Sequence, residues 1–324
     1  MTQTIRIKAT GGPEVLAWED VRLGAPASGE VHVRHNAVGV NYIDIYHRTG
    51  AYPLPLPSGL GVEGAGIVVA VGDGVTGFKA GDRVAYAGGP PGAYAEERFV
   101  PAARVLKLPD SVGFDVAAGL TFKALTVEYL IRRCFNVKRG DTVLFQAAAG
   151  GVGSIACQWL NELGATVIGT VSGEAKAVHA RANGCHHTID YKREDVAKRV
   201  RELTNGEGVA VVYDAIGKDT FAQSLQSLRT RGTLVSFGTV SGPTPPVDLA
   251  ELGAKGSLFV TRPSIAHYTA KRDELEAAAK SVFEMIGSGK IKAGKITTFA
   301  LREVAQAHRD LERGKTTGSI VLMP

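Results

Sequence analysis

Short runs in which apolar and polar residues alternate dominate the chain before Ala117, and glycine or proline residues separate these runs. Residues 30–34, 66–71 and 83–86 are three of them. Alternation with a period of two is typical of strands that bury one face, and glycine and proline are typical of the turns between strands. The first part of the chain is therefore predicted to form a β-rich domain.

A different pattern begins at Ala117. Helical periodicity extends from there through Tyr129 to Arg132, and short apolar runs then alternate with helical segments. Such alternation predicts a parallel sheet with crossover helices. Strands of this sheet are expected at residues 143–145, 165–171, 209–213, 232–238 and 257–260.

The pattern changes again after Pro263. Helical periodicity covers residues 273–286, a basic, strand-like turn follows at 290–292, and a second helix is expected at 304–311. A terminal strand is expected at residues 318–322. Because these segments follow a finished parallel sheet, they are expected to return to the β-rich domain. The predicted domains are residues 1–124 together with 264–324, and residues 125–263.

A glycine-rich turn follows the first strand of the predicted parallel sheet. Gly150, Gly151 and Gly153 stand between that strand and a helical pattern, and a second strand begins soon after the helix. Any tight turn from strand to helix can be rich in glycine. The strand–turn–helix–strand spacing nevertheless favours a dinucleotide site, in which the helix N-terminus binds a pyrophosphate.

The end of the second strand bears on the choice of cofactor, because an acidic residue there would bind a ribose 2′-hydroxyl and repel a 2′-phosphate. Ser172, Gly173 and Lys176 stand at this place instead, and Tyr191 follows the next strand. These residues favour NADPH over NADH. Two points weigh against the preference: Lys176 could be an ordinary surface lysine, and Glu174 lies close by.

The composition is that of a folded α/β protein. Of the 324 residues, 44% are hydrophobic, 21% are charged and 40 are glycine, which suits a protein with many tight turns. No apolar run approaches the roughly 20 residues that span a bilayer. The first residues alternate like a strand rather than like a leader peptide, and the three cysteines have no paired spacing. We expect a cytoplasmic protein that does not interact with a membrane.

The formal net charge of +5 raises the question of nucleic-acid binding. Basic residues in the segment 191–202 are interleaved with acidic ones, which is typical of a solvated helix face. A groove for a polyanionic cofactor explains the modest positive balance equally well. The dispersed charge argues against dedicated nucleic-acid recognition.

Several motifs together carry a family resemblance that covers essentially the whole chain. They are GGPEVL at residues 11–16, NYID at 41–44, GVEGAG at 61–66, GDRV at 81–84, AAAGGVG at 147–153 and YDAIG at 213–217. With these motifs the chain resembles the medium-chain dehydrogenase/reductase superfamily, and within it the zinc-independent quinone oxidoreductases related to ζ-crystallin. The resemblance implies an α/β fold, in which a GroES-like β-rich catalytic domain accompanies a Rossmann-type, doubly wound cofactor domain.

The chain departs from the zinc-dependent alcohol dehydrogenases of this superfamily. Those enzymes carry a cysteine ligand near residues 41–44 and a Gly-His-Glu motif where this chain has Gly61, Val62 and Glu63. Four closely spaced cysteines of a structural zinc lobe are also missing. No bound metal is expected. Without a Lewis acid, the substrate should be an acceptor that takes hydride readily, such as a quinone or an activated alkene.

The resemblance also implies site residues. Asn41, Tyr46 and Tyr52 are expected to position the substrate, although Asn41 could be a turn residue and the tyrosines packing aromatics. Lys315 is a cofactor candidate from a segment that matches the family pattern loosely. The full set of expected cofactor contacts is Tyr42, Ile43, Asp44, Ile45, Tyr46, Tyr129, Gly150, Gly151, Val152, Gly153, Ser172, Gly173, Lys176, Tyr191, Ile216, Phe237, Gly238 and Lys315.

The expected function is the NADPH-dependent reduction of a small-molecule quinone or another conjugated acceptor, by a homodimer like others of the family. One alternative is an enal or enoyl-thioester reductase of the same superfamily, which would use the same cofactor geometry. Another is a non-catalytic NADPH-binding protein, of the crystallin or the nucleic-acid-binding kind.

Overall fold

The computed structural model describes residues 1–324, and the chain divides into two compact units. The β-rich unit comprises Met1–Leu125 and Tyr268–Pro324, and the parallel-sheet unit comprises Thr126–His267. The boundaries expected from the sequence, after residues 124 and 263, lie close to these divisions. We propose that the two units are the two domains of the protein.

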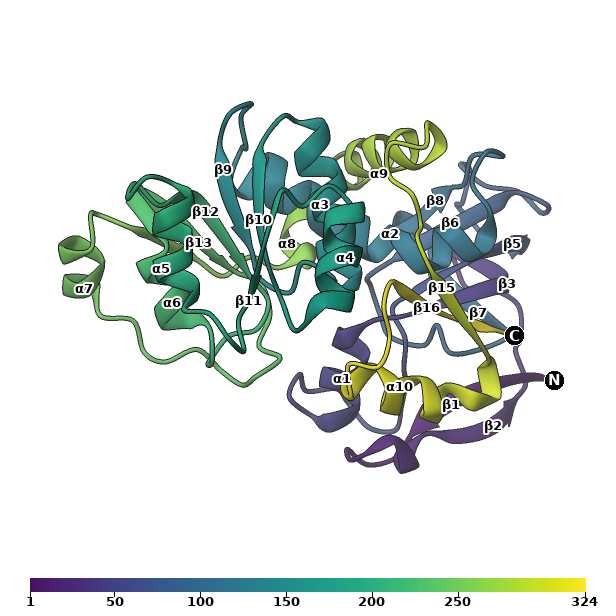
Figure 1. Cartoon of the computed structure of the whole chain (residues 1–324). Helices are drawn as coiled ribbons and strands as arrows, with labels where there is room; N and C mark the ends of the chain where they lie inside the picture. Colours follow the sequence, from purple (N-terminus) through teal and green to yellow (C-terminus); the bar gives the residue numbers. More distant parts are fainter. The chain divides into compact units, whose positions relative to one another are not determined.

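The β-rich unit contains a seven-stranded sheet and a three-stranded sheet (Figure 1). The larger sheet has the order β15-β16-β3-β5-β6-β8, and β7 also pairs with β3; the smaller sheet has the order β2-β1-β4. The strands are β1 (Thr2–Ile7), β2 (Ala17–Val21), β3 (Glu30–Val40), β4 (Ser58–Gly59), β5 (Glu63–Val71), β6 (Arg83–Ala87), β7 (Glu97–Pro101), β8 (Val105–Lys107), β15 (Ile296–Ala300) and β16 (Ser319–Met323).

The last strand of the chain, β16, lies antiparallel to β3, and Val38 to Val40 pair with Ile320 to Leu322. The C-terminal segment therefore completes the β-rich unit, as its sequence pattern predicts. Four helices belong wholly or mainly to this unit. They are α1 (Tyr42–Thr49), α2 (Phe114–Tyr129), α9 (Arg272–Gly287) and α10 (Val304–Glu312).

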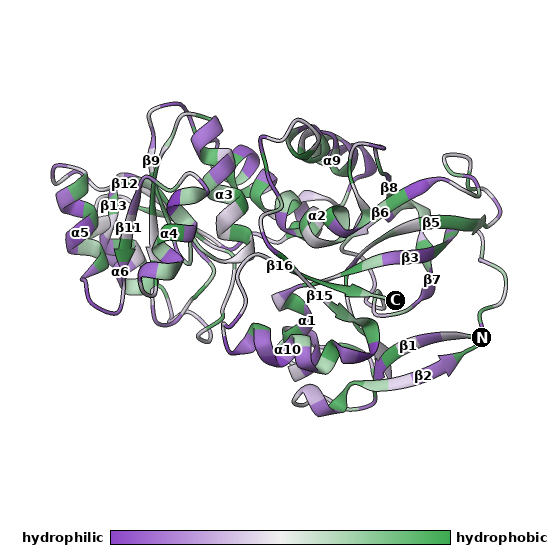
Figure 2. Ribbon diagram, turned by 45° about the vertical axis from the view of Figure 1, so that its right-hand side comes forward, coloured by the Kyte–Doolittle hydropathy of each residue, from purple (hydrophilic) through white to green (hydrophobic).

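The core of the β-rich unit is built by period-two alternation. Val31 and Val33 of β3 are fully buried, and they pack with Ile5, Ile7 and other apolar side chains of both sheets. Burial of such side chains contributes roughly 1.5–3 kcal/mol each. Figure 2 shows many hydrophilic residues along the helix α10, whereas the sequence of α2 is mostly apolar. The helix α1 begins directly after β3, so the strand sets the position of the first residues of the helix.

The parallel-sheet unit contains six parallel strands in the order β11-β10-β9-β12-β13-β14. This is the order of a doubly wound dinucleotide-binding fold, in which the order reverses beside the first strand. The elements are β9 (Thr142–Phe145), β10 (Thr166–Val171), β11 (His187–Asp190), β12 (Val209–Asp214), β13 (Leu228–Ser236), β14 (Phe259–Thr261), α3 (Gly151–Glu162), α4 (Glu174–Ala182), α5 (Val196–Leu203), α6 (Phe221–Gln226), α7 (Leu249–Ala254) and α8 (Ile265–Tyr268), which ends at the unit boundary.

The central strands of this sheet are apolar because helices cover both of their faces. Every residue of β12 is buried, and so are most residues of β9 and β10. Figure 1 shows α3 and α4 on one face of the sheet and α5 and α6 on the other. The fold class predicted from the sequence, a β-rich domain plus a doubly wound parallel sheet, is confirmed.

Two local expectations need adjustment. Residues 290–292 form a turn without a strand, and the strand that pairs with β16 is β15, whose alternating segment was not identified from the sequence. The helix α2 continues into a π-helical turn at Leu130–Cys134. None of the helices is long and apolar enough to cross a membrane.

Candidate active site

The expected substrate-positioning residues Tyr46 and Tyr52 form one aromatic cluster with Tyr42, at the start of α1 and just after it. The rings of Tyr42 and Tyr46 are 5.2 Å apart in an edge-to-face arrangement, and those of Tyr46 and Tyr52 are 4.9 Å apart. All three side chains are half-buried. Burial, followed by the neighbouring Tyr46, raises the pKa of Tyr42, so its phenol stays protonated and can donate a hydrogen bond.

The remaining residues at the start of α1 are less accessible. Asn41 is the N-cap of the helix, and Asn41 and Ile45 are buried, whereas Ile43 is half-buried. Asp44 is fully buried, and its Oδ2 atom accepts a hydrogen bond from the backbone N–H of Asn41 at 2.9 Å. This bond satisfies one of the backbone donors that a helix start leaves unpaired.

Asp44 is also the end of a hydrogen-bonded chain that reaches Arg48. The Tyr94 hydroxyl donates to Asp44 Oδ2 at 2.8 Å and lies 2.9 Å from Nε2 of His308. Nδ1 of His308 lies 3.0 Å from Nη1 of Arg48, which forms an ion pair with Glu312. Since a guanidinium only donates, His308 accepts at Nδ1 and carries its proton on Nε2.

Burial determines the pKa values of the side chains in this hydrogen-bonded series. Desolvation, and then the charge of Arg48, lower the pKa of His308 to about 3, which keeps the ring neutral. Desolvation raises the pKa of Asp44 to about 7, against two hydrogen bonds to Oδ2 that lower it. The Oδ1 atom of Asp44 is buried and has no hydrogen-bond partner. Asp44 therefore binds a proton near neutral pH.

A second buried carboxylate lies beside this site. Glu63 of β5 is fully buried and accepts hydrogen bonds from Nδ2 of Asn41 at 2.7 Å and from the backbone N–H of Phe122 at 2.6 Å. The ammonium of Lys123 is 3.9 Å from Glu63 Oε2. The side chain of Asn41 is thereby fixed by a group that the sequence analysis did not assign to the site.

In the parallel-sheet unit, the glycine-rich turn connects β9 to α3. Gly150 is the N-cap of α3, and Gly151, Val152 and Gly153 form its first turn, whose backbone N–H groups the helix itself cannot pair. A Cβ atom on Gly153 would lie 2.4 Å from the carbonyl oxygen of Ala147. The close packing of the turn therefore requires glycine at this position, as a dinucleotide-binding turn does.

The ends of β10 and β11 lie side by side at the carboxyl edge of the sheet. The backbone N–H of Tyr191 donates to the carbonyl of Val171, so Tyr191 stands next to Ser172. Glu174 forms an ion pair with Arg181, whereas the half-buried Lys176 has no ion-pair or hydrogen-bond partner. The nearby acid is thus neutralised, and Lys176 remains available to an anion.

The ends of β12 and β13 contribute the other expected contacts on this edge. Ile216 and Phe237 are half-buried and Gly238 is buried. Asp214 orders the first of these loops, because its Oδ1 atom accepts hydrogen bonds from the backbone N–H groups of Ile216 and Gly217 at 2.8 and 3.1 Å. The fold therefore brings together the contacts expected from residues 150–153, 172–176, 191, 216 and 237–238.

The two remaining expected cofactor contacts are Tyr129 and Lys315. Tyr129 is buried near the end of α2, and Lys315 is exposed in the segment between α10 and β16. Their roles stay predictions. The residues that the sequence analysis missed are the buried polar groups of the β-rich unit. A signal was present: Lys123 is a lone lysine in the apolar helix α2, and Glu63 starts an apolar strand.

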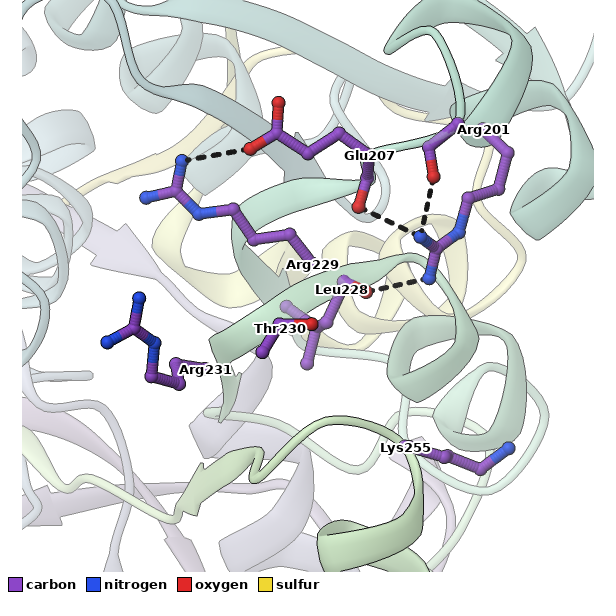
Figure 3. Close-up of a pocket in the computed structure, with 8 residues that line it drawn as sticks. Arg201, Glu207, Leu228, Arg229, Thr230, Arg231 and Lys255 are labelled. Atoms are coloured by element: carbon purple, nitrogen blue, oxygen red, sulfur yellow. Dashed lines mark hydrogen bonds and ion pairs between the residues drawn. The ribbon is translucent and has the colours of Figure 1, made fainter.

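A hollow of about 900 Å³ lies at the opposite, amino-terminal edge of the parallel sheet (Figure 3). Arg201 is fixed there by backbone carbonyls that include those of Glu207 and Leu228, and Arg229 points toward the carboxylate of Glu207. Ligands of open parallel sheets bind at the carboxyl edge. We therefore assign the candidate site to the other edge.

Comparisons with known proteins agree with this geometry. Residues 27–110 match the family model "Alcohol dehydrogenase GroES-like domain", and residues 151–289 match "Zinc-binding dehydrogenase". A quinone oxidoreductase of Pseudomonas aeruginosa is 50% identical, with 100% of both chains covered. A 2-haloacrylate reductase of a Burkholderia species is 46% identical, over 100% of this chain and 99% of the relative.

The crystal structure of the Escherichia coli quinone oxidoreductase complexed with NADPH superposes with a TM-score of 0.97 at 45% identity, and it covers 99% of this chain and 100% of its own. The chain belongs to the medium-chain dehydrogenase/reductase superfamily. Within that superfamily it is a member of the quinone oxidoreductase family, and the family prediction made from the sequence is confirmed. The side chains form no cluster of three or more potential metal ligands.

Proposed function

We propose that this protein is an NADPH-dependent quinone reductase that works without zinc. The observation that carries the proposal is the carboxyl end of β10, where Ser172, Gly173 and the unpaired Lys176 stand in place of an acidic residue. Full-length relatives that are 45–50% identical are named quinone oxidoreductase, and the E. coli protein was crystallised with NADPH.

The parallel-sheet unit fits a dinucleotide phosphate at two places. The first turn of α3 offers backbone N–H groups to a pyrophosphate, and Gly153 lets this turn pack closely against the carbonyl oxygen of Ala147. Ser172, Lys176 and Tyr191 would bind the adenosine 2′-phosphate. When bound, NADPH supplies the hydride for the reduction.

The β-rich unit supports the positioning of a flat, conjugated acceptor. We assign this role to Asn41, Tyr46 and Tyr52, whose amide and phenol groups can donate hydrogen bonds to an acceptor oxygen. Where zinc-dependent relatives carry a cysteine ligand near residues 41–44 and a histidine in a Gly-His-Glu motif, this chain has no cysteine and has Val62, which cannot bind a metal. Negative charge on the reduced acceptor would therefore be stabilised by hydrogen-bond donors.

The test is oxidation of NADPH in the presence of 1,4-benzoquinone or 9,10-phenanthrenequinone, with NADH and a chelator as parallel controls. We expect rapid turnover that prefers NADPH and does not respond to the chelator. Tight NADPH binding without quinone turnover would contradict the proposal and favour a non-catalytic binding protein. Retention on RNA or DNA that persists at saturating NADPH would favour the nucleic-acid-binding kind.

Cofactor preference has its own test at Lys176. Lys176→Ala removes an ammonium that has no partner in the protein, so stability should change by less than about 0.5 kcal/mol. We expect the KM for NADPH to rise about tenfold, because a charge-assisted bond to phosphate is lost, while the KM for NADH stays the same. Arg313→Ala, a change of an exposed cation elsewhere, serves as the control. An equal rise for both cofactors would contradict the assignment.

A second candidate activity is the reduction of an activated alkene. The observation that favours it is the 2-haloacrylate reductase of Burkholderia, which is 46% identical along the whole chain. The same cofactor site would serve an α,β-unsaturated acid, aldehyde or thioester. Parallel assays with 2-chloroacrylate, an enal and an enoyl thioester decide between the two activities by the ratio of kcat/KM values.

We also propose that the protein is a cytoplasmic homodimer that associates through the parallel-sheet unit. The strand β14 is the edge of its sheet and pairs only with β13. Phe259 of this strand is 60% exposed, and Leu249 of the preceding helix is 79% exposed. An exposed, apolar edge strand favours pairing with a second chain.

A further inference from the structure

The environment of Glu63 is specific for a carboxylate. Its Oε1 accepts the backbone N–H of Phe122 at 2.6 Å, and its Oε2 accepts an amide N–H of Asn41 at 2.7 Å. Because each oxygen accepts a short hydrogen bond, neither has to carry a proton to satisfy its surroundings. These bonds and the nearby ammonium of Lys123 favour the ionised form, against burial, which raises the pKa of Glu63.

The neighbouring strand leaves space for this carboxylate. A Cβ atom on Gly39 would lie 2.3 Å from Oε2 of Glu63 and 2.1 Å from the carbonyl oxygen of Ala118. Contacts this short do not occur for real Cβ atoms, so only glycine fits at this position of β3. The packing of β3, β5 and α2 is therefore built around the charged group.

Lys123 is the counter-charge. It is 7% exposed, its Nζ atom is 3.9 Å from Glu63 Oε2, and it donates to the carbonyls of Gly119 and Val40 at 3.0 and 3.4 Å. Burial raises the pKa of Glu63 and lowers that of Lys123, and each charge opposes the shift of the other. Removal of one partner alone would leave an uncompensated buried charge.

Asn41 is consequently fixed at two points by buried carboxylates. Its backbone N–H donates to Asp44, and its side-chain N–H donates to Glu63. Of the two ends of the Asn41 amide, an ionised Glu63 can accept a hydrogen bond from Nδ2 but cannot donate one to Oδ1. Glu63 therefore determines that the NH₂ end of the amide faces the carboxylate. The amide oxygen and the second N–H are thereby assigned fixed directions.

We propose that Glu63, paired with Lys123, is a positioning residue that fixes the side-chain amide of Asn41 for the electron acceptor. The inference rests on the proposed function, in which Asn41 positions the acceptor. Glu63 itself does not touch the reacting atoms. Its effect is to hold a hydrogen-bond donor in the one orientation that suits an acceptor oxygen, which supports catalysis by positioning.

Glu63→Gln tests the proposal with almost no change of shape. It also leaves Lys123 without its counter-charge, so the assays are run well below the melting temperature of the variant. Glutamine keeps an oxygen for Phe122 but places an NH₂ group against Nδ2 of Asn41, so the amide of Asn41 should turn over. We expect kcat with benzoquinone to fall about tenfold to a hundredfold, while the Kd for NADPH stays within about twofold. Glu97→Gln is the matched control, because Glu97 bonds His32 at 2.9 Å on the same sheet and has no contact with Asn41.

A second readout does not depend on turnover. The side-chain amide resonances of Asn41, identified by their loss in Asn41→Ala, should shift in Glu63→Gln and stay in place in Glu97→Gln. Unchanged kcat and unchanged resonances would overturn the inference while the proposed function stands. If the wild-type protein reduces no quinone, the proposed function fails, and the amide spectrum alone decides whether Glu63 fixes Asn41.

Lys123→Met provides a test that can be evaluated even if Glu63→Gln alone folds poorly. This change leaves Glu63 without its counter-charge, so the variant should melt below the wild-type protein. The double variant Glu63→Gln, Lys123→Met should melt above Lys123→Met alone, because no unpaired charge remains buried. Additive effects of the two changes would show that the pair does not act as a unit and would contradict the proposal.

Discussion

At the scale of single residues, the site depends on polar groups that the hydrophobic core encloses. Asp44 shows the cost most directly. Its folded pKa of about 7 exceeds the ordinary value of 3.8 because the carboxylate loses its hydration. Between these values the folded protein binds a proton that the unfolded chain has released. The stability that Asp44 contributes is therefore present at low pH and lost as the pH rises from about 4 to about 7.

Asp44→Asn should remove this pH dependence. The amide resembles the protonated acid, since it can still accept hydrogen bonds from Tyr94 and from the backbone of Asn41. A shift of about three pKa units corresponds to about 4 kcal/mol as an upper value. We expect denaturant unfolding of the variant to show a flatter decline of the unfolding free energy over this pH range. Parallel pH profiles of the two proteins would contradict the assignment to Asp44.

The sequence predicts those site residues that belong to a pattern within a few neighbouring positions, and it misses those that come together from distant segments. Gly150, Gly151 and Gly153 were identified because a turn of this kind needs glycine within a few positions. Glu63 and Lys123 come from β5 and α2, and His308 from α10, so only the folded chain brings these residues next to Asn41 and Tyr94. A charged residue in an apolar element indicates burial of a pair, but it does not name the partner.

At the scale of elements, the parallel-sheet unit follows from its sequence more directly than the β-rich unit does. Strands such as β9 and β12 are continuous apolar runs. Short turns connect these strands to the helices that lie between them in the sequence. The helix α1 and the strand β15 were not predicted, because α1 is only eight residues long and β15 is a half-buried edge strand. Their positions are set by tertiary pairing rather than by local periodicity.

The start of α3 gives a test at this scale. Gly153→Ala would place a methyl group 2.4 Å from the carbonyl oxygen of Ala147, so the turn must shift. We expect a loss of about 1–3 kcal/mol in stability and weaker NADPH binding. The control is Gly253→Ala in α7, where a Cβ atom meets nothing within 4 Å, and a gain of up to about 1 kcal/mol is expected there. Calorimetry and fluorescence titration measure both effects, and equal outcomes for the two variants would be contrary to this account.

At the scale of the whole molecule, the exposed edge of the parallel sheet is the surface to which we assign dimer formation. Phe259 lies on β14, which has one unpaired side. Phe259→Asp would place a charge on a face of the sheet beside that unpaired edge and should convert the proposed dimer to a monomer in sedimentation velocity. Val178→Asp, at a position 54% exposed on α4, is the control and should leave the mass unchanged. A wild-type protein that already sediments as a monomer would refute this interface.

The hydrogen-bonded chain from Arg48 to Asp44 has a fixed direction, and this has a consequence for isotope exchange. Arginine does not release its proton and His308 is neutral, so every donor points inward and no hydron can pass from Asp44 to the surface along this route. The acidic hydron of Asp44 belongs to Oδ1, the side without a partner. After solvent H₂O is replaced by D₂O, the proton of Asp44 should therefore exchange only when that side opens. The rate of this exchange then reports how often the site opens.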